Sequence, residues 1–404
     1  MSCNLGRVSR RKVTPRVVLS LAFAIFSLAA SPVPLHAALE GGIYARGHFD
    51  GITDVPGVRI AHLTKIEGSD VRTGATAIFP NEDPWNAKVA AAFEPYNGNG
   101  EMTGTHWIDE AGYLETPIVL TDTLDVGLAD NGVISYMMQR YPQIGLADDV
   151  PLPVVAECDD QTLNDIRGRH VTSQDVTTLL STAKPGQFSR GSVGAGTGME
   201  AFGFKAGIGS ASRLLPANLG GYVVGVLVND NTASDRALLS VDGTHVGRML
   251  QHQYLPVFPK RTSLIRSHGR VSDGSIIVVV ATNAPLDHRQ LRAIAKRVSL
   301  GMGRVGMTSH VGSGDLFLAF STAYLYKRDR HFSVLPPTVH PVEDTDVLNA
   351  LYGATVEATE YAIYDALFSA RTMTGRDGVT IYGLPVERVL QMIRATRKSE
   401  SGLQ

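Results

Sequence analysis

Cysteine is nearly absent from this sequence, which has only Cys3 and Cys158 among its 404 residues. Cys3 lies in an N-terminal segment that we expect to be removed, so Cys158 would be left alone and no internal disulfide could form. An excess of charge of one sign is also missing, because the formal net charge is −2 and 19% of the residues are charged. This composition is ordinary for a globular protein and gives no indication of a nucleic-acid partner.

Motifs that would mark a metal, nucleotide or ordinary serine-hydrolase site are missing as well. The sequence has no HExxH or CxxC pattern, so a zinc site is unsupported. Residues 301–306 match GxGxxG as a string but follow a predicted helix rather than a strand, and residues 198–205 miss the P-loop pattern by one residue. Residues 190–194 are not GxSxG, and no histidine is an obvious partner in a Ser-His-Asp triad.

An apolar run near the N-terminus, residues 17–30, is shorter than the roughly 20 residues that a membrane-spanning helix needs, and Pro32 and Pro34 follow it. The basic residues that precede the run are Arg7, Arg10, Arg11, Lys12 and Arg16. This pattern is typical of an export signal cleaved near Ala37, with an uncleaved anchor as the alternative. We therefore predict a signal peptide over 1–37, a periplasmic or secreted protein, and no membrane association once the signal is removed.

The remaining residues, 38–404, contain no low-complexity linker and no internal repeat, which favours a single domain. The predicted strands are 58–63, 75–79, 117–121, 153–156, 221–228, 275–280 and 316–320, and the predicted helices are 132–139, 291–298, 347–370 and 385–397. This order indicates an α/β fold with helices on the outside of packed sheets. Seven glycines between Gly191 and Gly209 indicate a place where backbone packs very closely against backbone or substrate.

The most informative local feature is the pair Gly274 and Ser275. A polar turn ending in these two residues runs into five β-branched or aliphatic residues, which places a serine at the first position of a buried strand. If the bond between Gly274 and Ser275 were cut, Ser275 would carry a nucleophilic Oγ and a free α-amine that could act as its general base. The alternative is an ordinary turn that enters a strand.

Other polar residues stand at the ends of predicted strands. Ser313 and Asp315, held between glycines, could hydrogen-bond and orient the α-amine of a nucleophile, although a capped glycine turn is the alternative. Glu157 could pair with the α-ammonium of a substrate, and Asn231 could donate to a developing oxyanion. A solvated loop residue and a turn asparagine are the respective alternatives.

Taken together, these segments resemble the self-processing aminopeptidase family that includes the L-aminopeptidase/D-amidase-esterases and the β-peptidyl aminopeptidases. The matching stretches are residues 52–58, 97–104 with Glu110, 114–123, 163–165, 191–213, 224–228, 273–286 and 313–322. The resemblance implies an αββα four-layer sandwich like that of the N-terminal-nucleophile hydrolases. It also implies cleavage between Gly274 and Ser275 into an α chain, 38–274, and a β chain, 275–404, and a homotetramer of such αβ units.

The same resemblance implies roles for individual residues. Ser275 corresponds to the nucleophile, Ser313 to the hydroxyl that contacts its α-amine, Asn231 to the oxyanion-side asparagine, and Glu157 to the carboxylate near the substrate amine. The sequence departs from the family pattern at two further positions. The family usually has glutamate where Asp315 stands, and some members have a tyrosine lining the site where Asp159 stands.

The chemistry implied is acyl transfer to Ser275 and release of an N-terminal residue from peptides, amino-acid amides or esters, including β-peptides, without a metal or organic cofactor. Two alternatives stay open. One is an acetyl-ornithine-type acyltransferase, although those related enzymes use threonine as the nucleophile. The other is a non-catalytic exported binding protein that keeps the fold and is never cut. The sequence leaves open whether L-α, D-α or β-amino acids are released.

Overall fold

The computed structural model describes Met1, Leu39 and residues 42–259, 274–329, 331, 333–335, 337 and 340–401. The chain forms two units, Met1–Val33 and Pro34–Gln404, and everything below concerns the second. Apart from Met1, which is exposed, the predicted signal peptide 1–37 lies outside the described residues. The polar turn predicted before Gly274 also lies outside them. Among the described helices, none is both long enough and apolar enough to cross a lipid bilayer.

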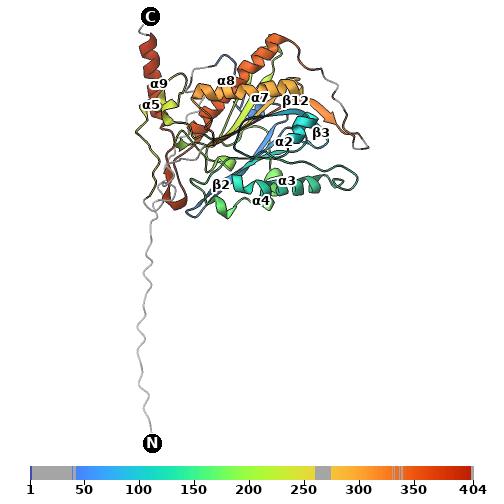
Figure 1. The fold of residues 1–404 in the computed structure, drawn as a ribbon, viewed down its shortest axis with the longest axis horizontal. Coiled ribbons are helices and arrows are strands. Elements are labelled where there is room, and N and C mark those ends of the chain that lie inside the picture. The colour runs from blue at the N-terminus through green and yellow to red at the C-terminus, as the bar shows by residue number, and fades with distance from the viewer. Residues whose placement is uncertain are drawn as a thin grey trace. The chain divides into compact units, whose positions relative to one another are not determined.

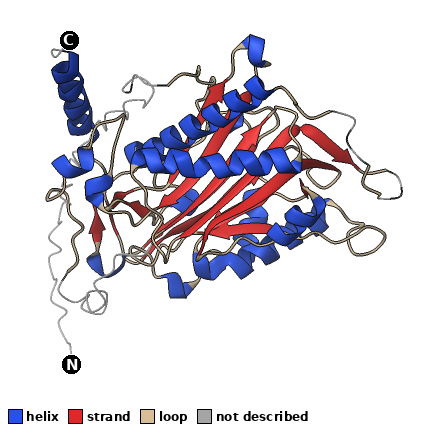
Figure 2. Ribbon diagram, turned by 45° about the horizontal axis from the view of Figure 1, so that its top comes forward, coloured by secondary structure: helices blue, strands red, loops and turns tan. Residues whose placement is uncertain are grey.

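Two β-sheets form the centre of the second unit (Figures 1 and 2). The larger has the order β4-β3-β12-β11-β10-β9, with bounds Tyr113–Leu114, Ala87–Gly98, Gly314–Lys327, Ser275–Thr282, Val223–Asn231 and Ile208–Leu214. The smaller has the order β1-β2-β5-β6, with bounds Arg59–Glu67, Val71–Phe79, Ile118–Thr121 and Val154–Glu157. Within the larger sheet, β11 pairs parallel with β12 and antiparallel with β10.

Helices cover the outer face of each sheet, so the unit has four layers. Helices α7 (His288–Val305) and α8 (Thr345–Ser369) pack on the six-stranded sheet, while α3 (Val126–Arg140) and α4 (Ser173–Leu180) pack on the four-stranded one (Figure 1). A third apolar core lies between the two sheets. The other α-helices and strands of the described residues are α2 (Thr105–Ala111), α5 (Val246–Met249), α9 (Val386–Ser401), β7 (Glu200–Ala201), β8 (Phe204–Lys205), β13 (Met373–Thr374) and β14 (Thr380–Ile381).

The residues of strand β11 are apolar almost without interruption because both faces of the strand are buried. Ile276, Val278 and Val280 point into the core under α7 and α8. Ile277 and Val279 point into the core between the sheets. Since successive side chains of a strand face opposite sides, a strand buried on both faces needs apolar residues at every position. The serine at its start is therefore an exception that calls for an explanation.

The glycine-rich segment packs backbone against backbone, as its composition indicates. A Cβ atom at Gly207 would lie 2.2 Å from the carbonyl oxygen of Gly191, and one at Gly209 would lie 2.0 Å from that of Ala362 on α8. Lys205, fully buried, donates from Nζ to the carbonyl oxygens of Gly196, Met199 and Ala206 at 3.2, 2.6 and 2.8 Å. A buried ammonium with three acceptors holds this segment in one conformation.

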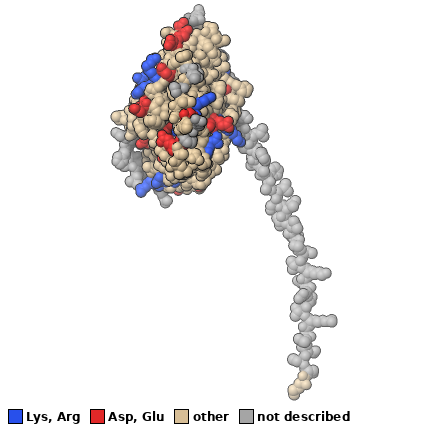
Figure 3. Space-filling model, turned by 90° about the vertical axis from the view of Figure 1, so that its right-hand side faces the viewer, with Lys and Arg blue, Asp and Glu red and all other residues tan. Residues whose placement is uncertain are grey.

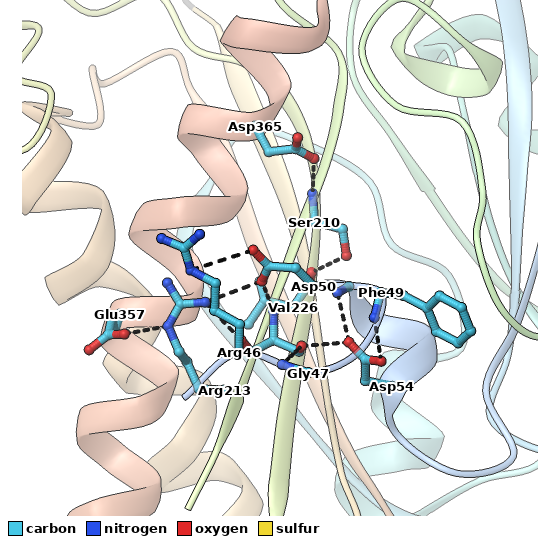
Figure 4. A network of polar contacts seen from close by, with 12 residues as sticks. Arg46, Gly47, Phe49, Asp50, Asp54, Ser210, Arg213, Val226, Glu357 and Asp365 are labelled. Atoms are coloured by element: carbon cyan, nitrogen blue, oxygen red, sulfur yellow. Dashed lines mark hydrogen bonds and ion pairs between the residues drawn. The ribbon is translucent and has the colours of Figure 1, made fainter. Parts of the chain in front are cut away.

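A polar network fastens β9 to α8 and to the segment that precedes β1 (Figure 4). Arg213 on β9 donates from Nε to Glu357 on α8, and its Nη1 lies 3.3 Å from Asp50 Oδ1. About two helical turns further along α8, Asp365 Oδ2 accepts from the backbone N–H of Ser210 at 3.0 Å. Arg213 and Glu357 are both buried, so the charge of Glu357 depends on Arg213 for compensation, whereas Arg213 has Asp50 as a second partner.

We expect Glu357→Gln to lower the free energy of unfolding by about 2 kcal/mol, because it removes one charge of a hydrogen-bonded buried pair. Glutamine can still accept the 2.7 Å hydrogen bond from the backbone N–H of Ile43, so the change tests the charge more than the shape. Urea denaturation measures this change in the free energy of unfolding. The control is Arg304→Gln, which breaks an ion pair with Glu360 in which the arginine is 55% exposed and should cost less than about 1 kcal/mol. Equal losses in the two variants would contradict the prediction.

On the face drawn in Figure 3, acidic and basic side chains are interspersed rather than gathered by sign.

Candidate active site

Ser275 is the first residue of β11, as the sequence predicts, and is 4% exposed. It stands directly opposite Asn231 on β10 and Gly314 on β12. The ends of three neighbouring strands therefore bring together the residues that the sequence analysis singled out. Strand β10 continues three residues past the predicted strand, 221–228, so Asn231 ends the strand as its last paired residue and not as part of a turn, which was the alternative.

Gly274, immediately before Ser275, occupies a position that no other residue fits. Its φ is +80°, and a Cβ atom there would lie 2.3 Å from the backbone N of Ala233 and 3.0 Å from the carbonyl oxygen of Asn231. Only glycine adopts such a left-handed conformation in so narrow a space without strain. The chain therefore turns sharply at the peptide bond that the sequence analysis marks for cleavage.

A cavity of about 500 Å³ opens beside Ser275. Its lining residues are Gly98, Asn99, Gly100, Glu101, Thr123, Glu157, Asp159, Gln161, Gly274, Ser275 and Gly312. The structure thus brings four of the predicted site residues, Gly274, Ser275, Glu157 and Asp159, to one cavity. Asn231, Ser313 and Asp315 lie next to it without being part of its lining.

Glu157 is the last residue of β6, on the four-stranded sheet, and its side chain faces the cavity formed with the other sheet. It is buried, with Oε1 accepting from the backbone N–H of Glu101 at 3.0 Å and Oε2 accepting from the hydroxyl of Thr123. Burial raises the pKa of Glu157, and the nearby carboxylates of Asp159 and Glu101 add to this effect. Such a carboxylate is poised to bind a cation.

The amide of Asn231 is oriented by two hydrogen bonds. Its Oδ1 accepts from the backbone N–H of Glu200 at 3.0 Å, and its Nδ2 donates to the carbonyl oxygen of Asp159 at 2.8 Å. Because the oxygen is held by an N–H donor, the NH₂ group must face Ser275, whose Oγ is 3.4 Å away. A donor fixed beside a hydroxyl can stabilise negative charge that develops next to it.

Ser313 and Asp315 contact each other, with the Ser313 hydroxyl donating to Asp315 Oδ1 at 2.6 Å. Asp315 lies beside Ile276, one residue past Ser275, and both residues are buried. Burial raises the pKa of Asp315, while hydrogen bonds from Ser309 and Ser313 and the charge of His310 lower it. The Ser275 nitrogen is part of a peptide bond in this chain, so the predicted contact of Ser313 with a free α-amine stays a prediction.

The sequence analysis gave no role to several residues of the site. Thr123 and Gln161 hold Glu157 and Asp159, respectively, through side-chain hydrogen bonds. Cys158, which lies between these two residues in the sequence, is fully buried; its thiol donates to the carbonyl oxygen of Asn229 at 3.6 Å and also interacts with Ser275. Burial raises the pKa of that thiol, so it stays neutral and packs as a small apolar group.

A further buried carboxyl, Asp230, faces the opposite side of β10 from Asn231. It stands beside Ile276, as Asp315 does from the other side, and Oδ2 of each aspartate has no hydrogen-bond partner among the described residues. Thr232 donates to the other oxygen of Asp230. Burial raises the pKa of Asp230 to about 7, and the charge of Asp315 adds to this. The two strands that flank the start of β11 thus each carry a poorly solvated acid.

This geometry predicts a pH-dependent stability. Asp230 keeps its proton in the folded chain up to a pH of about 7, whereas an unfolded aspartate loses it near pH 4. The folded chain binds more protons between these pH values, so its free energy of unfolding falls as the pH rises through them. Asp230→Asn removes this titration, and we expect it to stabilise the chain by about 2 to 3 kcal/mol at pH 8, with the gain shrinking toward pH 4.

The measurement is urea denaturation across this pH range in a Ser275→Ala background, which keeps the chain in one piece. Replacing the exposed Asp109 by asparagine is the matched control and should shift stability by less than about 0.5 kcal/mol at any pH. If Asp230→Asn and its parent lose stability in parallel between pH 4 and pH 8, the buried acid is not the cause.

No cluster of three or more His, Cys, Asp or Glu side chains with the geometry of a metal site occurs among the residues that the structure describes. That the chemistry needs no cofactor stays a prediction.

Solved structures share this arrangement of sheets and helices. The L-aminopeptidase D-Ala-esterase/amidase from Ochrobactrum anthropi, described as a prototype of the serine aminopeptidases and a variant of the Ntn hydrolase fold, matches with a TM-score of 0.80 at 35% identity, over 91% of this chain and 99% of that one. A Burkholderia sp. beta-aminopeptidase matches with a TM-score of 0.79 at 36% identity, over 88% of this chain and 97% of that one. The predicted αββα sandwich is confirmed. Fold and site together define a hydrolase of the aminopeptidase class with an N-terminal-nucleophile fold.

Sequence comparison identifies the family more closely. The family described as Peptidase family S58 matches residues 50–381, and this chain belongs to it. The beta-peptidyl aminopeptidase BapA from Sphingosinicella microcystinivorans is 38% identical over 363 residues, which cover 87% of this chain and 89% of that protein. The family resemblance predicted from the sequence is therefore confirmed. Self-cleavage, export, assembly and the roles of single residues stay predictions.

Proposed function

We propose that this protein is an exported, self-processing serine aminopeptidase that releases the N-terminal residue of peptides, amino-acid amides or esters, including β-peptides, through an acyl-enzyme on Ser275. One observation carries the proposal. A serine at the start of an otherwise apolar buried strand lines the same cavity as a buried glutamate, with the amide of Asn231 3.4 Å from its Oγ.

Self-cleavage would begin at the sharp turn of Gly274. Ser275 Oγ attacks the carbonyl carbon of Gly274, the bond from that carbon to the Ser275 nitrogen breaks, and an ester to Oγ forms while the nitrogen becomes an amine. Water then hydrolyses the ester, leaving a carboxylate on Gly274 and a free hydroxyl and α-amine on Ser275. The left-handed φ of +80° at Gly274 supports this step, because the turn presents the peptide bond at the cavity instead of continuing the strand.

The freed serine would then act on substrates. Its α-amine accepts the proton of its own Oγ as that oxygen attacks the carbonyl of the substrate's N-terminal residue, and the Asn231 amide stabilises the oxyanion. Glu157 binds the substrate α-ammonium, which restricts the reaction to chain ends. Ser313, hydrogen-bonded to Asp315 at 2.6 Å on the neighbouring strand, orients the α-amine. The oxyanion then collapses to an ester on Oγ and expels the leaving amine or alcohol, which takes the proton from the Ser275 α-amine. Water hydrolyses the ester, which releases the amino acid and restores the hydroxyl.

The names of the relatives support the range of substrates. One is a beta-peptidyl aminopeptidase, another a beta-aminopeptidase, and a third acts as an L-aminopeptidase and a D-Ala-esterase/amidase. A panel of aminoacyl nitroanilides that differ in backbone and stereochemistry would show which of these this enzyme takes.

Intact mass spectrometry of the purified protein tests the proposal. We expect two polypeptides that meet between Gly274 and Ser275, and hydrolysis of at least one nitroanilide. An uncut chain that hydrolyses none of them would support a non-catalytic binding protein instead. Turnover of acetyl-ornithine would favour the acyltransferase.

Export and assembly belong to the same proposal. The basic residues and apolar run of 1–37 support a cleaved signal, so the α chain of exported protein should begin near residue 38 and appear in the periplasmic or extracellular fraction. Light scattering should give the mass of a homotetramer of αβ units. A full-length N-terminus in the cytosolic fraction would contradict export.

A further inference from the structure

We infer that this enzyme prefers substrates whose N-terminal residue carries a second cationic group in its side chain, and that Asp159 recognises that group. Lysine, ornithine and their β-homologues belong to this class. The inference rests on the proposed function, because it concerns the cavity into which Ser275 faces.

The first reason is the chemical character of the cavity wall. None of its described lining residues has an aliphatic or aromatic side chain, since the wall consists of glycines, a serine, a threonine, an asparagine, a glutamine and three acidic residues. Pockets that bind apolar ligand groups are lined predominantly by hydrophobic and aromatic side chains. A leucyl or phenylalanyl side chain would therefore gain little apolar contact on this wall.

The second reason is the charge of the wall. Glu101, Glu157 and Asp159 line the cavity, and no lysine, arginine or histidine is among its described lining residues. The proposed mechanism assigns Glu157 to the substrate α-ammonium, which leaves two carboxylates without a counter-charge from the substrate. Both of these carboxylates act on Glu157, since the charges of Asp159 and Glu101 contribute to its raised pKa. A substrate with a second cation relieves this repulsion.

Asp159 is better placed than Glu101 to bind the cationic side chain of the substrate. Glu101 is exposed, whereas Asp159 is half-buried and accepts hydrogen bonds from the backbone N–H and the side-chain amide of Gln161. A carboxylate has about four acceptor positions, so Asp159 retains capacity for a cation. These two bonds also fix the direction in which the carboxylate points.

The backbone of Asp159 is tied to the nucleophile through a single side chain. The amide Nδ2 of Asn231 donates to the carbonyl oxygen of Asp159 at 2.8 Å and lies 3.4 Å from Ser275 Oγ. Asp159 also follows Glu157 by two residues at the end of β6. The three groups that would hold the scissile carbonyl, the α-ammonium and the side-chain cation are therefore fixed relative to one another.

The test compares matched nitroanilides on the purified, processed enzyme. Lysyl and norleucyl nitroanilides share a four-carbon side chain, to which lysine adds the terminal ammonium, and the β-homolysyl and β-homonorleucyl pair covers the other backbone. We expect kcat/KM for the lysyl member of the accepted pair to exceed that for the norleucyl member by at least about tenfold, and the ratio to fall as ionic strength rises. Glutamyl nitroanilide should be the poorest substrate.

Two variants distinguish a specific contact with Asp159 from the overall negative charge of the cavity. Asp159→Asn keeps the size of the side chain and should bring the lysyl-to-norleucyl ratio to about one, whereas Asp165→Asn, a change of a half-exposed aspartate on the same loop, should leave the ratio at its wild-type value. A norleucyl rate that equals the lysyl rate, or a ratio that survives Asp159→Asn, would overturn the inference and leave the proposed aminopeptidase intact. Failure to hydrolyse either member of both pairs would overturn the proposed function, and the inference with it.

Discussion

Replacing Ser275 by alanine is expected to leave one uncut polypeptide and to lower hydrolysis of every aminoacyl nitroanilide by at least about 10⁴-fold. Both effects have one cause, because the same Oγ attacks the Gly274 carbonyl during cleavage and the substrate carbonyl afterwards. Without cleavage, the Ser275 nitrogen stays in a peptide bond and cannot accept a proton. Intact mass spectrometry and initial rates measure the two effects on one preparation.

Two further variants show whether the loss is chemical or structural. Ser321→Ala removes another buried serine hydroxyl of the same sheet, one that donates to the Ala284 carbonyl oxygen at 2.6 Å, and should still be cut and active. Ser275→Cys keeps a nucleophile at the site and should still be cut, although at a different rate. Cleavage of Ser275→Ala between residues 274 and 275 would show that Ser275 Oγ is not the attacking group.

Strands buried on both faces were predictable wherever β-branched residues fill them. The run from Ile276 to Val280 is such a case, and β11 begins at the serine that the sequence indicated. β9 was missed because its residues, Ile208–Leu214, are mostly glycine, serine and alanine, which have low strand propensity. Gly209 explains this composition, since α8 packs so closely that a Cβ atom would lie 2.0 Å from the Ala362 carbonyl oxygen.

The alanine-rich strand β3 was missed for a related reason. Most of its apolar residues are alanines, with Ala90 and Ala92 packed under the helices and Val89, Ala91 and Phe93 packed between the sheets. Alanine favours helices in isolation, so tertiary packing overrides local propensity here. Helix α4, Ser173–Leu180, was too short for its apolar period to stand out, although Thr172 caps it.

Some features of the site could likewise be predicted from the sequence, whereas others depend on how the two sheets pack. Glu157, Asn231 and Ser275 end or begin predicted strands, so their meeting at one edge follows from strand order. Asp230 could have been placed from the alternation of side chains along β10, since it neighbours Asn231 and must face the other way. The contact of Cys158 with Ser275 joins two different sheets, and no local pattern predicts the distance between sheets.

Glu157→Gln is expected to lower kcat/KM for nitroanilides by about a thousandfold while leaving self-cleavage intact. The glutamine keeps an oxygen for the backbone N–H of Glu101, which now lies 3.0 Å from Oε1, so the local structure should survive. What disappears is the charge that would hold the substrate α-ammonium, and loss of one partner of a buried charge pair costs about 2 to 5 kcal/mol. The internal peptide bond at Gly274 has no ammonium next to it, so its cleavage does not need this carboxylate.

The comparison that isolates this role uses substrates with and without the amine. Wild type and Glu157→Gln should differ strongly on an aminoacyl nitroanilide and little on the corresponding des-amino acyl nitroanilide, which Ser275 can attack but Glu157 cannot hold. Glu101→Gln, which alters an exposed carboxylate of the same cavity, should cause a smaller loss than Glu157→Gln. If the Glu157→Gln chain stays uncut, the charge of Glu157 is needed for self-cleavage, before any substrate binds. Such a result would contradict a role limited to binding the substrate amine. A Glu157→Gln enzyme that is cut but loses activity equally on both substrates would place the defect at Ser275 and not at the binding of the amine.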